Sequence, residues 1–268
     1  YAPIDTNIPD VWRNVAFGQA VLDGAAVLNE IEEAQNAGTY AESDLVKGMV
    51  TNAERTAVRK LADGLRNATP GANEPNSVVS LIETTAFGSQ VSTTGDLVRS
   101  SFPTQWQNQR DNTLIDISGA AGLRDLESFM LQSLTHGAAK SEQVDFGITR
   151  PQHYARLSSL ADNLRRWQED ATLAQLGFNS IKVLGAGIIA DPSMPANRIY
   201  LLNTNYLFLK VLRTPGQQQV GDNPESVPLS VKDFVEEAPT LNKVAKMYVV
   251  LNLCVTSLRH QGVNDNVT

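Results

Sequence analysis

Cysteine is nearly absent from this chain of 268 residues, which contains only Cys254. An internal disulfide needs two cysteines, so a disulfide-stapled fold is excluded, and a single thiol is typical of a protein that matures in a reducing compartment. A chain of this length buries enough apolar surface to be stable without disulfides or metal. We therefore expect one large domain or two smaller ones.

Long apolar runs and basic clusters are lacking too. No run approaches the roughly 20 apolar residues of a membrane-spanning helix, and the opening YAPIDTNIPD has neither the basic start nor the apolar stretch of a secretory signal. The 22 Lys and Arg are outnumbered by 29 Asp and Glu, for a formal net charge of −7. Without a cation cluster to neutralise phosphates, we expect neither sequence-specific nucleic-acid binding nor membrane association.

The strongest local pattern is helical. Residues 11–28 mix β-branched and aromatic residues with two glycines, which predicts a long, bent, partly exposed strand. Thr39 and Glu42 then have the spacing of a capping box. Apolar residues recur every four positions from there up to the break around Pro70: Leu45, Met49, Ala53, Ala57, Leu61 and Leu65. We expect one unbroken helix over about 40–68, which would extend about 40 Å.

The remainder mixes helices and strands. Residues 71–113 predict loops and small strands. A second helix is expected after Ser118 and a third near Pro151. Strands are expected over 181–183, 199–212 and 247–255, the last with one buried face. The expected apolar faces of the two helices comprise Leu123, Leu126, Met130, Leu131 and Leu134, and Tyr154, Leu157, Leu160, Ala161, Leu164 and Trp167. This order predicts an α+β fold without βαβ regularity.

The string VLGAGIIA, residues 183–190, offers the main enzymatic alternative. Gly185 and Gly187, followed by Ala190, match the dinucleotide-binding pattern GxGxxG/A after a strand. That pattern binds pyrophosphate at the N-terminus of the helix that follows the glycines. Because Pro192 and Pro195 come within a few residues, we expect a strand and a bend that bind no nucleotide.

The other chemically versatile residues favour structural roles. His136, His153 and His260 lie in unlike contexts, and none neighbours a GxSxG nucleophile elbow. His136 ends a predicted helix, where a cation interacts favourably with the helix dipole. Cys254 lies within the last predicted strand, where a small buried thiol is expected.

An acidic cluster, Glu30, Glu32 and Glu33, is the one candidate for a hard cation. Metal sites need oxygen ligands that converge from several directions, so a solvated acidic turn is favoured. The sequence thus predicts no catalytic, cofactor-binding or metal-binding residue and no cofactor.

Four segments, taken in order, resemble the major capsid proteins of tailed bacteriophages, whose shell fold is shared by encapsulins. They are NEIEEAQNAGTYAESDLVKGMVTNAE, VDFGITRPQHYARLSSL, GFNSIKVLGAGIIADPSMPANRIYLLNTNYLFLKV and NLCVTSLRHQGV. The third is similar to the family's pattern G-F-x-x-x-x-F-x-G-x-P-V-x-x-D-x-x-x-P-x-x-x-x-Y-F-L-N-T-x-Y-L. The last departs slightly from the family's ending over 255–258.

The resemblance implies an extended E-loop, a peripheral domain with a long spine helix, and an axial domain. In this chain residues 1–38 would be the returning E-loop strand and its turn into the peripheral domain. Residues 39–69 would be the spine helix and 70–198 mostly the axial domain. Residues 199–268 would be strands that return to the peripheral domain, with a loop at about 213–240.

The function implied is that of a non-enzymatic structural subunit. Copies would assemble through hexamers and pentamers into the icosahedral shell of a virion, in the host cytoplasm, enclosing double-stranded DNA without sequence-specific binding. Scaffolding, portal and cementing proteins are the further partners implied. An encapsulin-like compartment is the close alternative, and a soluble NAD-dependent oxidoreductase is the alternative from another class.

Some family members cross-link their shells covalently through a lysine on the E-loop. The first lysine of this chain, Lys47, falls inside the predicted spine helix. We therefore expect a shell held by non-covalent interfaces.

Overall fold

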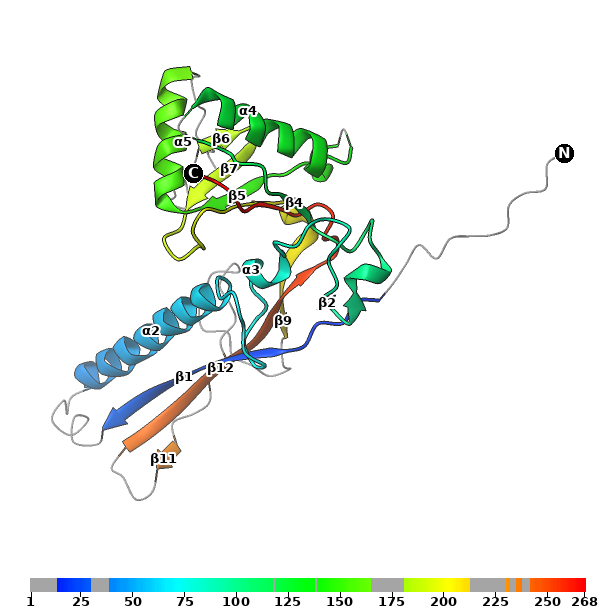
Figure 1. The fold of residues 1–268 in the computed structure, drawn as a ribbon. Helices are drawn as coiled ribbons and strands as arrows, with labels where there is room; N and C mark the ends of the chain where they lie inside the picture. Colours follow the sequence, from blue (N-terminus) through cyan, green and yellow to red (C-terminus); the bar gives the residue numbers. More distant parts are fainter. Residues whose placement is uncertain are drawn as a thin grey trace.

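Two large sheets organise the chain, a long narrow one and one of six short strands, beside a small sheet of two strands (Figure 1). The computed structural model describes residues 14–29, 39–117, 119–137, 139–164, 181–212, 230–231, 235–237 and 242–268. All statements below concern these residues.

The long sheet, called the ribbon here, is built around β12 (Asn242–Val255). On one edge β1 (Ala20–Asn29) pairs antiparallel with β12, from Ala20 opposite Leu251 to Asn29 opposite Asn242. The other edge holds β9 (Leu207–Leu212), β10 (Ser230–Val231) and β11 (Val235–Glu237). The expected loop over 213–240 therefore contains two short strands.

The first strand is shorter than predicted. Residues 14–19 precede β1 without strand structure, and 11–13 lie outside the described residues. The segment instead runs past the tight turn between β2 (Thr93–Thr94) and β3 (Leu97–Val98), where the Ala16 amide donates to the Gly95 carbonyl at 3.2 Å. Val15 and Phe17 there pack against Trp106 and its buried neighbours. Tertiary packing, not strand pairing, holds this part of the chain.

The long helix is confirmed as α2 (Thr39–Gly64), continuous through Ala53 (Figure 1). Its buried stripe of Ala53, Ala57 and Leu61 follows the predicted spacing. Leu61 packs against Val249 and Leu251 of β12, so one face of the ribbon carries the helix.

The helix ends four residues earlier than expected. The chain folds back after Gly64, and a Cβ at that position would lie 2.9 Å from Cγ of Pro75. The Ser77 hydroxyl also donates to the Asn67 carbonyl. These contacts replace further helical turns up to residue 68.

The six-stranded sheet has the order β4 (Gln109–Asp111), β13 (Gly262–Asn264), β8 (Ile199–Leu202), β5 (Phe146–Thr149), β7 (Ala186–Ala190) and β6 (Ile181–Val183). The pairs β4–β13 and β5–β7 are parallel and the others antiparallel. Its strands come from both sides of residue 198, so the expected domain boundary there passes through this sheet.

Both faces of the six-stranded sheet are covered. On one face α4 (Ala120–Phe129), which continues as a π-helix over Met130–Leu134, and α5 (Pro151–Leu164) bury the cluster that includes Leu126, Leu157, Ile188, Ile199 and Leu201. On the other face α3 (Val78–Leu81) contributes Val79 to a cluster with Tyr200 and Leu202. The two predicted helices are confirmed. Burial of Leu160, Ala161 and Leu164 is not described, and Trp167 lies outside the described residues.

Three local predictions are wrong. Within 71–113, where only loops and small strands were expected, Val78–Leu81 forms the helical turn α3, because Ser77 and Ser80 satisfy each other's backbone amides as a capping box. Leu131 is 57% exposed, since the buried stripe passes through Met130 and Leu134 and leaves Leu131 one position off it. The strand predicted over 199–212 is two strands, β8 and β9, in different sheets, separated by a 3₁₀ turn over Thr204–Tyr206.

The last predicted strand is confirmed but longer. It begins at Asn242, and from residue 251 to 255 both of its faces are buried. One face meets two hydrophobic clusters, one with Leu61 and one with Trp106, and on the other face the side-chain amide of Asn252 donates to the Gly18 carbonyl at 2.6 Å.

Candidate assembly site

The two glycines of VLGAGIIA lie in a β-hairpin. Leu184 and Gly185, with φ of 49° and 93°, form the two-residue turn between β6 and β7, and Gly187 lies within β7 opposite Lys182. Two positive φ angles in such a turn match the strand twist. No helix follows the glycines, because β7 runs on to Ala190. The expected strand and bend are confirmed, and the helix required by the oxidoreductase alternative is absent from these described residues.

Two of the three histidines come together, which sequence reasoning missed. The His260 ring stacks on Tyr206 with centroids 4.0 Å apart and meets His136 edge-on at 4.8 Å. Its Nε2 lies 2.8 Å from Glu142 Oε2, and the Ser257 hydroxyl lies 2.7 Å from its Nδ1. These residues are as much as 124 positions apart, so no local pattern could indicate the cluster.

Hydrogen bonding tunes the cluster. Tyr206 donates to Glu142 Oε1 at 2.7 Å, and this bond with that from His260 holds the pKa of Glu142 below its usual range. The same bond raises the pKa of Tyr206. Burial lowers the pKa of His136, whose Nε2 lies 3.1 Å from the Arg259 carbonyl.

The cluster lies where the chain passes between the sheets. One crossing joins β8 to β9 through 203–206, and the other joins β12 to β13 through 256–261. The Gln261 side chain accepts from the Asn203 amide at 3.0 Å and donates to the Asn203 carbonyl at 3.1 Å. Thr256 N donates to the Tyr206 carbonyl at 2.9 Å. These bonds, with the His260 contacts, hold the two crossings together, which is a structural role.

Two of the remaining candidates from the sequence, Cys254 and His153, are buried among the described residues. Cys254 is buried, and burial raises the pKa of its thiol, which disfavours the nucleophilic thiolate. His153 is buried in α5 with burial lowering its pKa. Glu30, Glu32 and Glu33 lie outside the described residues. Among the described side chains no group of His, Cys, Asp and Glu has the arrangement of a metal site, and no described helix is long and apolar enough to cross a membrane.

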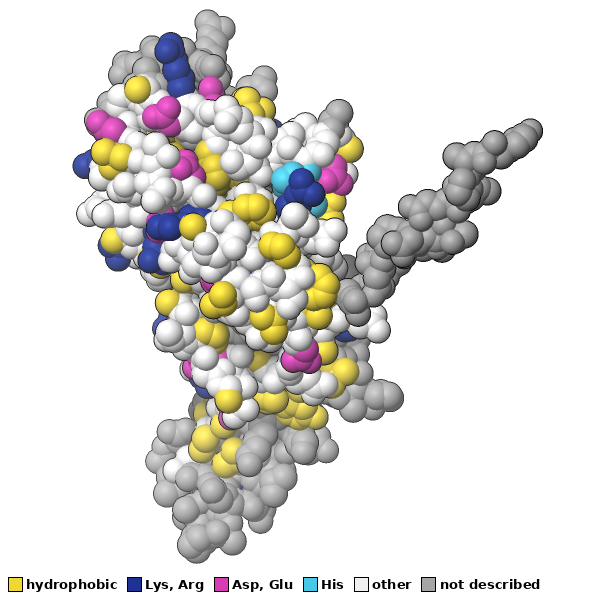
Figure 2. Space-filling model, turned by 45° about the vertical axis from the view of Figure 1, so that its right-hand side comes forward, with side chains coloured by type: hydrophobic (Ala, Val, Ile, Leu, Met, Phe, Trp, Pro, Cys, Tyr) yellow, Lys and Arg dark blue, Asp and Glu magenta, His cyan; other side chains and the backbone are white. Residues whose placement is uncertain are grey.

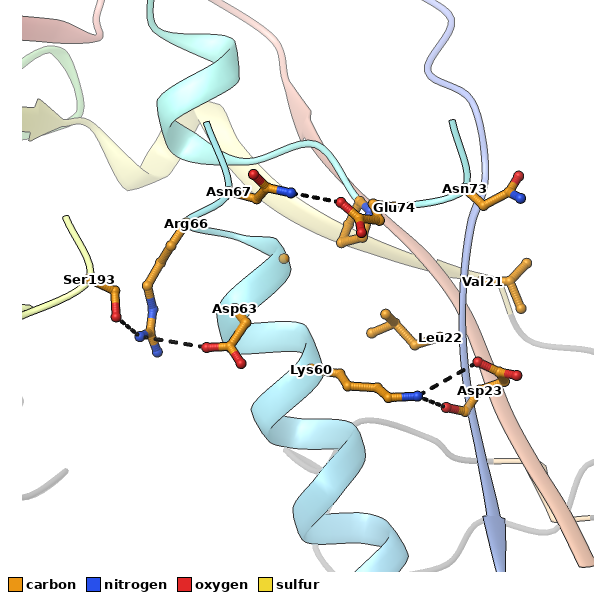
Figure 3. Close-up of a pocket in the computed structure, with 12 residues that line it drawn as sticks. Val21, Leu22, Asp23, Lys60, Asp63, Arg66, Asn67, Asn73, Glu74 and Ser193 are labelled. Atoms are coloured by element: carbon orange, nitrogen blue, oxygen red, sulfur yellow. Dashed lines mark hydrogen bonds and ion pairs between the residues drawn. The ribbon is translucent and has the colours of Figure 1, made fainter. Parts of the chain in front are cut away.

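A cleft of about 630 Å³, lined mostly by polar residues, lies between β1, the end of α2 and the loop after it, and reaches Ser193 in the turn after β7 (Figure 3). Lys60 reaches across to β1 and donates to the Asp23 carbonyl at 2.8 Å. Arg66, in the turn after α2, points the other way and donates to Ser193 Oγ at 3.0 Å. Its Nε also lies 3.0 Å from Asp191 Oδ2. The cations of this cleft are thus used to join elements of the chain.

A second cleft, of about 540 Å³, is lined mainly by apolar side chains, among them Phe17, Phe102, Trp106, Phe208 and Val255. It opens beside the face of the ribbon opposite α2. Figure 2 shows hydrophobic side chains over the middle of the molecule with few charged ones among them.

The ribbon face opposite α2 carries exposed apolar side chains. Val21 and Leu212 flank Val250 on neighbouring strands, and they are 48% and 50% exposed. Phe208, further along β9, is 42% exposed. Apolar side chains gathered on an exposed face are typical of protein–protein contact surfaces.

The fold has counterparts among solved structures, whereas no protein-family model and no curated sequence matches the chain. The cyanophage A-1(L) capsid asymmetric unit is similar over 93% of this chain and 77% of that one, with 17% identity and a TM-score of 0.68. The encapsulin of the holo-SrpI complex from Synechococcus elongatus PCC 7942 is similar over 94% and 75%, with 12% identity and a TM-score of 0.56.

The capsid of an empty GTA particle is similar over 93% of this chain and 74% of that one, with 9% identity and a TM-score of 0.56. All three are proteins of closed shells, and in each case the likeness spans nearly the whole of this chain. At these identities what is shared is the backbone architecture. The chain therefore has the shell fold that phage capsid proteins and encapsulins share.

Proposed function

We propose that this chain is the major capsid protein of a tailed bacteriophage, a structural subunit without enzymatic activity. Copies assemble as hexamers and pentamers into an icosahedral head shell that encloses double-stranded DNA. The observation that carries the proposal is the likeness to the cyanophage capsid subunit over 93% of the chain, with the highest of the three TM-scores above. The encapsulin likeness is weaker, at a TM-score of 0.56.

The elements fit the parts of a shell subunit. The ribbon and α2 would form the peripheral domain, with α2 as the spine helix and residues 1–38 as the E-loop strand and its turn. The six-stranded sheet with α4 and α5 would form most of the axial domain. Exposed apolar side chains on the ribbon suit burial against neighbouring copies, because closed shells need extensive contacts between identical subunits.

The charge suits a DNA container. A formal net charge of −7 disfavours tight binding of phosphates, so packaged DNA can enter and leave. The subunit would assemble in the host cytoplasm and end in the virion, with scaffolding, portal and cementing proteins as further partners.

The test is negative-stain imaging of the purified protein. We expect closed shells, capsomers or sheets, and a small monodisperse monomer would contradict the proposal. Particles recovered from infected cells distinguish the two shell functions. Nuclease-protected double-stranded DNA supports the capsid, and an enclosed cargo enzyme without DNA supports the encapsulin alternative.

A further inference from the structure

Arg66 connects the ribbon–α2 part of the molecule to the six-stranded sheet, and the apolar clusters of these two parts also meet at Val78 and Leu207. It follows α2, whose buried stripe packs on the ribbon. Its guanidinium reaches Asp191 and Ser193, which lie in the turn after β7 of the six-stranded sheet, at 3.0 Å each. In Figure 3 the Arg66 side chain extends from the end of the helix toward Ser193, away from the ribbon.

The receiving turn is itself firmly built. Asp191 Oδ1 accepts from the Ser193 amide at 2.9 Å, and the Asp191 amide donates to the Thr149 carbonyl of β5 at 2.8 Å. The turn therefore moves together with the six-stranded sheet, whereas Arg66 moves together with α2. Whether Arg66 can bond to Asp191 and Ser193 therefore depends on the angle between two bodies, the ribbon with α2 and the six-stranded sheet.

Two chain crossings form another part of the junction. Residues 203–206 and 256–261 pass from one sheet to the other and are bound together by the Asn203–Gln261 and Tyr206–His260 contacts. Two adjacent, mutually bonded segments can act as a hinge, because backbone rotations there leave both sheets intact. The 630 Å³ cleft beside Arg66 is lined by β1, α2 and the loop after α2, and it reaches the other body at Ser193.

The bond is also weak enough to open. The Arg66 side chain is 27% exposed and that of Asp191 is 19% exposed, so water screens the pair. A partly screened ion pair adds a small bias between two arrangements, which other contacts can overcome.

We propose that Arg66, Asp191 and Ser193 form a latch that sets the angle between the ribbon–α2 body and the six-stranded sheet about the two crossings. This inference rests on the proposed function: the latch is closed in some subunits of a shell and open in others, according to the local curvature of the shell. The same chain then fits hexamers and pentamers by a rotation at the hinge, in which repacking is confined to the side chains that both clusters share, Val78 and Leu207.

The test compares Arg66→Gln with Lys60→Gln. Both side chains line the same cleft, but Lys60 bonds to Asp23 within the ribbon–α2 body and so serves as the matched control. For Arg66→Gln we expect an unchanged fold and faster amide exchange over residues 191–194 of the free subunit, by about two- to fivefold, from loss of a partly exposed ion pair. We also expect a lower share of uniform closed shells in negative stain. Lys60→Gln should change neither.

A charge swap, Arg66→Asp with Asp191→Arg, should restore uniform shells if the ion pair itself matters. If the swapped variant does not fold, the double variant Arg66→Gln with Ser193→Ala replaces it. Circular dichroism checks that this variant is folded, and a lower share of uniform shells than in wild type is the expected result. If wild-type protein forms shells and Arg66→Gln behaves as Lys60→Gln does, the latch is refuted while the proposed function stands. If wild-type protein forms no shells, the proposed function fails, and the exchange measurement alone tests the bond.

Discussion

At the scale of single residues, Arg99 has the most demanding environment. Its side chain is fully buried, and the other buried polar groups of the 83–108 segment are organised around it. Its guanidinium donates to Thr94 Oγ1, Gln90 Oε1, Asn108 Oδ1 and the Leu81 carbonyl at distances of 2.5–3.1 Å, and Glu83 lies 3.5 Å away. Burial lowers the pKa of Arg99, and Glu83 opposes this.

We predict that Arg99→Met destabilises the subunit by about 3–5 kcal/mol, because the partners of the buried cation are left unpaired. Arg99→Lys should also destabilise it, since an ammonium cannot reproduce the planar fork. Urea unfolding of free subunits measures both. Arg55, exposed on α2, is the control, and Arg55→Met should stay within about 0.5 kcal/mol of wild type. Equal stabilities for the variants at 99 and 55 would show that the network is dispensable.

At the scale of elements, α5 carries a buried histidine that should make its packing sensitive to acid. His153 is 4% exposed, and its Nδ1 has no hydrogen-bond partner. Burial first, and then Arg156 and Arg150, lower its pKa. The folded protein therefore holds this ring neutral at a pH where the unfolded chain protonates it.

We predict that subunit stability falls as pH drops below about 6.5, the ordinary histidine value, because only the unfolded chain gains the proton there. His153→Gln should reduce the slope of unfolding free energy against pH between about 6.5 and 5.5, where one such group contributes up to about 1.4 kcal/mol per pH unit. His136 adds to the wild-type slope, since burial lowers its pKa as well. An identical slope in wild type and His153→Gln would contradict the prediction.

At the scale of the whole molecule, the ribbon adds lysines that the expectation of a non-covalent shell did not consider. No lysine occurs in β1, but β12, its paired strand, carries Lys243 and Lys246. Sequence reasoning considered only the lysines before the spine helix. Nucleophilic attack requires an uncharged amine, which for lysine needs deep burial, and Lys243 is only partly buried.

We still predict a non-covalent shell. Mature particles boiled in detergent should give a single band near 29.1 kDa, or slightly above it, on a denaturing gel. The double variant Lys243→Arg with Lys246→Arg is the control, since it retains both charges and removes both amines. A ladder of multimers in wild type that disappears in the double variant would overturn the prediction and assign the nucleophile to Lys243 or Lys246.

Local sequence determined the elements whose signals are periodic. The four-residue spacing of Ala53, Ala57 and Leu61 is enough to specify a helix and its buried face, and alternation does the same for the last strand. Pro192 and Pro195 excluded a helix after Gly187 without reference to any other part of the chain. Such features depend on backbone geometry within a few residues, so they can be read in isolation.

Only the tertiary structure decided what distant segments do together. It divided 199–212 between two sheets, ended α2 at Gly64 against Pro75, and brought Glu142, Tyr206 and His260 into one cluster. It also placed Arg66 opposite Asp191, a pair separated by 125 positions. The physical reason is that pairing across sheets and between side chains depends on the three-dimensional path of the chain, which local periodicity does not encode.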